Sequence, residues 1–162
     1  MPNKSLFQVT MNQASMDKVV ALVKQFPNEL RRRVLEKALF NAALMVLRSA
    51  QDNVRKHNLS GDLYKSLARK KISSFSETGA YIYARRTKQF KGGFHAHLLE
   101  YGHRMVVKKK KGMFSGLYQI GHVQAFPFIR PALADNDSKV LDHIAKVTAK
   151  ALKRYRLGRP MS

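Results

Sequence analysis

The side chains that most resemble a metal-binding set are four histidines and a glutamate. His95 and His97 form a His-x-His pair, and Glu100 follows three residues later. On a β-strand, such a pair with a nearby glutamate could bind zinc. The segment 94–101 has instead the length of a two-turn helix closed by Gly102, and on a helix residues two apart point in different directions. The remaining candidate ligands are His103 and His122. We expect no metal or other cofactor, because the His-x-His pair cannot bind one ion together on a helix.

Catalytic patterns are absent from the sequence. The chain has no Gly-x-Ser-x-Gly elbow, no Walker-type glycine-rich loop and no dense cluster of carboxylates. It contains no cysteine, which excludes disulfides and thiolate metal sites. Asp135 and Asp137 are better explained as helix-capping groups. The prediction is that the protein is not an enzyme.

Positive charge dominates the composition. Lys and Arg number 31 against 10 Asp and Glu, so the formal net charge is +21 in 162 residues. A field of that sign favours polyanions or acidic protein surfaces as partners. The basic residues that could line a DNA channel or contact a partner are Arg104, Lys108, Lys109, Lys110, Lys111, Lys146, Lys150 and Lys153. For both groups, the run and the helix face, a merely solvated surface is the alternative.

Two helices are expected in the first third of the chain. After a short strand over 5–11, a helix capped by Asn12 or Ser15 should run to Phe26. From Pro27 a long amphipathic helix should extend to about residue 56. Its apolar stripe consists of Leu30, Val34, Leu35, Ala38, Leu39, Ala42, Met45 and Val46.

Strands and turns are expected in the middle of the chain. A short helical turn over 63–67 precedes two strands, 72–75 and 80–84, which form a hairpin. A third extended pair should comprise 104–107 and 116–123, with the lysine run in its tip at 108–113. That tip should be mobile.

The C-terminal part should begin with an irregular crossing segment over 126–133, because its two prolines exclude a central strand. Asp135, Asn136 or Asp137 would then cap a last helix. The residues expected to face inward on it are Val140, Leu141, Ile144, Val147 and Ala151.

These elements predict an α+β fold, with long N-terminal helices and a C-terminal helix packed on a small, mostly antiparallel sheet. Residues 1–153 should form a single domain with a basic loop near 104–113, and 154–162 a basic, flexible tail. No stretch approaches ~18 uninterrupted apolar residues, and the first residues lack a secretion signal. A soluble intracellular product without membrane contact is expected.

Two blocks of the sequence resemble the lambdoid bacteriophage tail-component family. They are Leu-Glu-Tyr-Gly, ending at Gly102, and the proline-containing block 126–133. The resemblance covers about 27–150, with a tyrosine at 101 and His103 where the family usually has phenylalanine and threonine. The residues at signature positions are Glu100, Tyr101, Gly102, Pro127, Phe128, Arg130, Pro131 and Ala132.

The resemblance implies a structural virion protein that acts at the neck, in tail completion or head–tail joining. It would form a ring around the DNA channel, with six copies favoured and twelve possible. Its other partners would be neighbouring neck proteins, such as head-closure, tail-terminator or tail-tube proteins, and phage DNA in transient, nonspecific contact. It would be made in the host cytoplasm and reside in the virion.

Several alternatives stay open at this point. Glu100 could meet an arginine such as Arg130 across a subunit boundary or within its own subunit. The prolines that flank Phe128 could hold it for the core or for docking onto a partner ring. The alternative function is sequence-nonspecific nucleic-acid binding. Its candidate residues are Tyr81 and Tyr83, which alternate on a strand ahead of Arg85 and Arg86.

Overall fold

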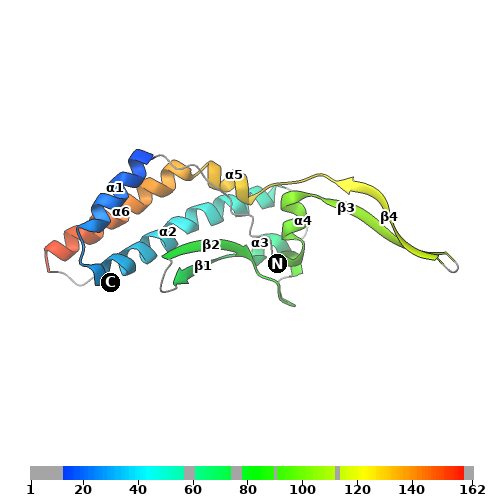
Figure 1. Cartoon of the computed structure of the whole chain (residues 1–162), viewed down its shortest axis with the longest axis horizontal. Helices are drawn as coiled ribbons and strands as arrows, with labels where there is room; N and C mark the ends of the chain where they lie inside the picture. The colour runs from blue at the N-terminus through cyan, green and yellow to red at the C-terminus, as the bar shows by residue number, and fades with distance from the viewer. Residues whose placement is uncertain (1–12, 57–60, 74–77, 90, 112–113, 159–162) are drawn as a thin grey trace.

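A long helix forms the axis of the computed structural model, which describes residues 13–56, 61–73, 78–89, 91–111 and 114–158 (Figure 1). The expected strand over 5–11 lies outside these ranges. In chain order the elements are α1 (Gln13–Lys24), α2 (Asn28–Arg55), α3 (Asp62–Ser66), β1 (Leu67–Ser73), β2 (Thr78–Ala84), the 3-10 turn η1 (Lys91–Phe94), α4 (Ala96–Tyr101), β3 (His103–Lys111), β4 (Phe114–Val123), α5 (Ile129–Ala134) and α6 (Asp137–Arg156).

Helix α2 confirms the long helix predicted from the apolar stripe, and Pro27 directly precedes its first turn. Alanine, valine and one leucine side chain are buried along it at helical spacing, which lets other elements approach closely on several sides. These residues are Val34, Ala38, Ala42, Val46, Leu47, Ala50 and Val54. Around α2 pack α1, α5, α6 and the β1–β2 hairpin.

The turn between α1 and α2 is held by an arginine. Arg31 donates from Nε to the Phe26 carbonyl at 2.8 Å and from Nη2 to the Lys24 carbonyl at 2.9 Å. These bonds satisfy carbonyls at the end of α1 that the helix itself leaves without donors. Phe26 is 1% exposed and packs with Val34 and Leu152, which joins α1, α2 and the end of α6.

Strands β1 and β2 form an antiparallel hairpin against α2, but β1 begins at Leu67, five residues before the predicted strand. The inward positions of β1 include Arg69, whose guanidinium lies 3.8 Å from the ring centroid of Phe40 and donates to the Phe40 carbonyl. Burial lowers the pKa of Arg69, and the nearby positive charge of Arg48 lowers it further.

Strands β3 and β4 form a second, separate two-stranded sheet, which we call the ribbon. The expectation that the lysine run forms a loop is wrong: backbone pairing continues through Lys111, which lies opposite Phe114. The register shifts between Met105 and Val106, and Ile120 on β4 is left without a partner. The ribbon extends away from the helical body at one end of the molecule (Figure 1).

The C-terminal part also departs from the prediction. The segment 126–133 is irregular only in its first half, because α5 begins at Ile129. Pro131 fits in its first turn, where a backbone N–H has no partner within the helix. The start of α6 has no side-chain cap: the Asn136 amide donates instead to the Ala132 carbonyl at 2.8 Å.

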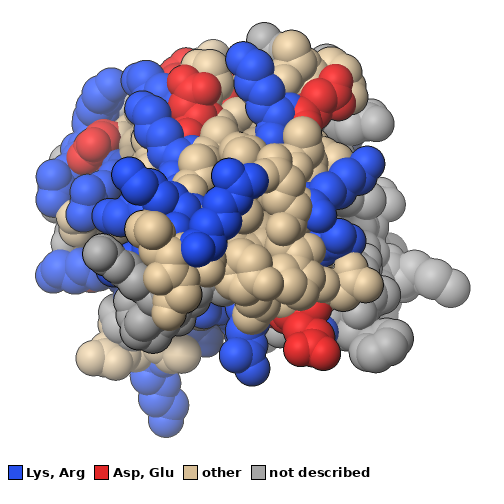
Figure 2. Space-filling view, turned by 90° about the vertical axis from the view of Figure 1, so that its left-hand side faces the viewer, with Lys and Arg blue, Asp and Glu red and all other residues tan. Residues whose placement is uncertain are grey.

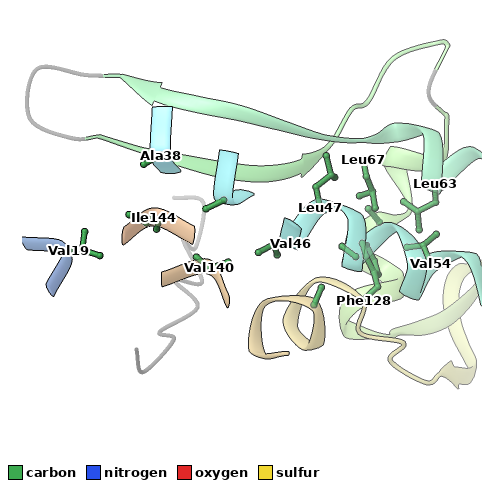
Figure 3. Close-up of a cluster of buried hydrophobic side chains, with 14 residues drawn as sticks. Val19, Ala38, Val46, Leu47, Val54, Leu63, Leu67, Phe128, Val140 and Ile144 are labelled. Carbon is green, nitrogen blue, oxygen red and sulfur yellow. The ribbon is translucent and has the colours of Figure 1, made fainter. Parts of the chain in front are cut away.

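The main core runs along α2 and joins α1, α3, β1, α5 and α6 (Figure 3). From α6 it takes Val140 and Ile144, as predicted, whereas Val147 is only partly buried. The fold is α+β as expected, although with two small sheets in place of one. Helix α6 continues to Arg156, so the expected tail is helical at its start. No helix within the described ranges is long and apolar enough to cross a membrane.

Candidate functional site

Glu100 lies at the centre of the contacts that join the two sequence blocks, and we call this region the Glu100 junction. Its side chain is buried, with the residue 3% exposed. Oε2 accepts from the backbone N–H groups of Phe128 at 2.8 Å and Ile129 at 3.0 Å, and Oε1 accepts from that of Arg130 at 3.2 Å. A carboxylate therefore satisfies the N–H groups at the start of α5 and interacts favourably with the positive end of the helix.

Arg130 completes the junction from its exposed side. Its Nε donates to Glu100 Oε1 at 3.2 Å, and its Nη2 donates to the Glu100 carbonyl at 2.9 Å. The guanidinium carbon also lies 5.3 Å from the ring centroid of Tyr101. Of the two alternatives for Glu100 and Arg130, the structure has the contact within one chain. The buried acid is paired and hydrogen-bonded, as buried charge requires.

Gly102 is the single residue between α4 and β3, and its position requires glycine. Its φ is 69°, and a Cβ added there would lie 2.6 Å from the Val123 carbonyl oxygen and 2.8 Å from the Ala125 nitrogen. The end of α4 and the segment after β4 are also joined by a hydrogen bond, in which the Phe126 N–H donates to the Leu99 carbonyl at 2.7 Å. Glycine is required both for the positive φ and for this close approach of two backbones.

The other signature residues close the core beneath the junction. Phe128 and Ala132 are fully buried, and the Asn53 amide of α2 donates to the Phe128 carbonyl at 3.2 Å. Pro127 and Pro131 on either side are half-buried. Phe128 is thus a core residue, and the docking alternative does not apply to its side chain.

The ribbon leaves this junction with apolar side chains in contact with solvent. Met105 is 43% exposed, Val106 55% and Ile120 58%. Arg104 and His122, paired across the strands, are also exposed. In the part of the chain that the structure describes, no other element makes more than marginal contact with the ribbon. Lys108 to Lys111 belong to β3 by their backbone.

The four candidate histidines lie in or next to three elements, α4, β3 and β4. His95 precedes α4 and His97 lies in its first turn, whereas His103 opens β3 and His122 is near the end of β4. Within the described ranges, no three His, Asp or Glu side chains gather closely enough to hold a metal ion.

A cleft of about 350 Å³ lies between α2 and α6, and we call it the basic cleft. Of the candidate residues on α6, Lys150 lines it, whereas Lys146 and Lys153 are exposed outside its lining. The other cations at its rim are Arg33, Lys37 and Arg154. Leu30, Val34, Val147 and Ala151 form its apolar floor, with Asn41 beside them.

Sequence reasoning missed the two cations of α2. Their signal was present, because Arg33 and Lys37 are four residues apart on one helix, as are Lys150 and Arg154 on the other. What the sequence did not reveal is that these two helix faces meet. Lys and Arg side chains predominate at the end of the molecule where α2 begins and α6 ends (Figure 2).

Tyr81 and Tyr83 lie on the face of the β1–β2 hairpin that points away from α2. Their ring centroids are 5.5 Å apart, and Tyr81 is 40% exposed. Lys70 is paired with Tyr81 across the hairpin and is also exposed. Arg85 has a structural role, since its Nη2 donates to the Lys65 carbonyl at 2.7 Å.

Comparisons of this chain with protein-family models, with curated proteins and with solved structures find no match.

Proposed function

We propose that the protein is a structural component of a tailed bacteriophage virion, acting in tail completion or head–tail joining at the neck. The observation that carries the proposal is the Glu100 junction. Glu100 of the first block accepts hydrogen bonds from Phe128 and Arg130 of the second, and Gly102 lies against the backbone of Val123 and Ala125, which lead into the second block. Because the two blocks are in contact, they support the resemblance more strongly than two unconnected sequence matches would.

The ribbon supports a role in assembly. It offers exposed apolar side chains on an arm that no other described element covers. A two-stranded ribbon is marginally stable by itself in water and gains from burial against another molecule. In a ring, one patch meets a different patch on the next copy, and a protruding arm suits such a heterologous contact. We propose a ring of six copies, with twelve as the alternative.

Basic side chains would serve the DNA channel in this role. Arg104 on the ribbon and Lys146 and Lys153 on α6, which lie outside the basic cleft, are exposed. Contacts of such groups with phosphates depend on salt and carry no sequence information. That behaviour suits a channel through which DNA passes.

The test is removal of the gene from a phage that encodes this chain. Electron microscopy of the lysate is expected to show separate heads and tails, and the infectious titre should fall by orders of magnitude. Expression of the intact protein in trans should restore both, and serves as the control. Normal, infectious particles without the protein would overturn the proposal.

A second candidate function, sequence-nonspecific binding of single-stranded nucleic acid, is favoured by the outward pair Tyr81 and Tyr83 with Lys70 beside them. Aromatic rings can stack on bases of any sequence. Titration of random single-stranded DNA at increasing salt separates the two functions. Nanomolar binding at physiological salt that is lost in the double variant Tyr81→Ala/Tyr83→Ala would favour this one. Weak binding that vanishes near ~0.15 M salt would favour the virion role.

A further inference from the structure

We infer that the basic cleft binds an acidic amphipathic helix of a partner protein. The inference is independent of the virion role proposed above. It begins from the chemistry of the lining, in which an apolar floor lies between two rows of cations. Of the described residues that line the cleft, none is acidic.

The spacing of the cations fits a helix as the guest. Arg33 and Lys37 on α2, and Lys150 and Arg154 on α6, are each separated by four residues. That separation corresponds to ~6 Å along a helix axis. A guest helix lying along the groove repeats its own side chains at i and i+4 with the same ~6 Å spacing. Its carboxylates can therefore meet the rows on both sides.

The floor determines what the guest presents between its carboxylates. Val34 is 5% exposed, and Leu30, Val147 and Ala151 are partly buried around it. Apolar side chains inserted here would remove this surface from water, as in other complexes where a helix occupies a groove. The expected partner segment therefore has a row of apolar residues flanked by Asp or Glu.

Nucleic acid fits the cleft less well. Phosphates would use the cations but gain nothing from an aliphatic floor. Single strands bind through aromatic platforms, and the described lining contains no aromatic residue.

A second copy of the chain also fits less well. Each copy carries a net charge of +21 and only 10 acidic residues. Two such copies repel one another, and the cleft would add to that repulsion unless it met an acidic segment.

The experiment measures fluorescence anisotropy with the full-length protein at 0.15 M salt. The probe is a labelled 14-residue helical peptide with a leucine row flanked by glutamates. One control peptide replaces every leucine with glutamine at the same charge, and a single-stranded DNA of 14 nucleotides is the second control. We expect the leucine peptide to bind about tenfold more tightly than either control, which corresponds to ~1.4 kcal/mol.

Two charge-matched variants locate the binding. Arg33→Glu/Lys150→Glu reverses one cation on each side of the cleft, and we expect it to weaken peptide binding about tenfold or more. Lys65→Glu/Lys88→Glu makes the same change of charge on segments that do not line the cleft and should alter binding by less than about twofold. All four side chains are exposed, and circular dichroism verifies that both variants are folded.

Several outcomes would overturn the inference. Equal binding of all three probes, or an equal loss of binding in both variants, would show that the protein attracts polyanions in general and that the cleft has no specific role. Absence of peptide binding to the folded protein would show that the cleft does not bind such a helix. Self-association in sedimentation velocity that Arg33→Glu/Lys150→Glu abolishes would make a second copy the occupant. Each of these leaves the test of the virion role unaffected.

Discussion

The Glu100 junction and the ribbon are neighbours in the chain, yet they differ in how their groups are satisfied. In the junction, both carboxylate oxygens accept hydrogen bonds from α5 and the aromatic core beneath is buried. In the ribbon, Val106 and Ile120 are more than half exposed. Glu100, which looked like a candidate ligand, stabilises the fold, whereas ordinary apolar and basic residues form the surface open to other molecules.

Loss of the Glu100 carboxylate should be the most damaging change in this comparison. Glu100→Ala leaves the N–H groups of α5 and the Arg130 guanidinium without their acceptor, and we expect a loss of about 3–5 kcal/mol in the free energy of unfolding. Glu100→Gln keeps one acceptor oxygen and should lose about 1–3 kcal/mol. Urea denaturation measures both. Asp52→Ala, which removes an exposed pair with Arg55, is the control and should leave the midpoint unchanged.

If Glu100→Ala cost less than about 1 kcal/mol, the junction would not be a major source of stability. The contrast with the ribbon would then lose its energetic basis.

Gly102→Ala should have the next largest effect. The substitution imposes a positive φ on alanine and places its Cβ against two backbone atoms, so we expect a loss of about 2–4 kcal/mol. Gly158→Ala is the matched control, because Gly158 also has a positive φ, 64°, but has nothing within 4 Å of an added Cβ. It should lose about 1 kcal/mol. Equal losses in thermal denaturation would show that strain alone, without the close approach, sets the requirement at 102.

Ile120→Ser should have the smallest effect on stability. The side chain is 58% exposed, so the free energy of unfolding should change by no more than about 0.5 kcal/mol. Phe128→Ala in the junction is the apolar comparison and should lose about 3–5 kcal/mol. In the phage test, Ile120→Ser should fold normally yet restore fewer joined particles than the intact protein. Full restoration would exclude this part of the ribbon from the contact.

The sequence predicted the long helices well, missed the short helix α5 and predicted the strands less well. Helix α2 is long and periodic, so its bounds differ from the prediction by about a residue. Strand β1 was placed too late because Arg69 and Lys71 occupy inward positions and hide the alternation; both cations lie over the ring of Phe40. The four consecutive lysines of β3 also show no alternation of apolar and polar residues, so their sequence suggested a loop.

The candidate sites divide in the same way. Glu100 and Arg130 could be paired from the sequence because their residue types are complementary. The basic cleft depends on the packing of α2 against α6, which no local pattern records.

The register shift at Ile120 has a consequence for copies of this chain at high concentration. Both strands of the ribbon are edges, and an open edge can template pairing with another molecule, which leads to aggregation. A bulge increases the local twist and interrupts the regular row of hydrogen-bonding groups, while consecutive lysines in an edge strand repel a second such strand. The bulge and the lysines thus disfavour edge-to-edge pairing between the ribbons of two copies of this chain.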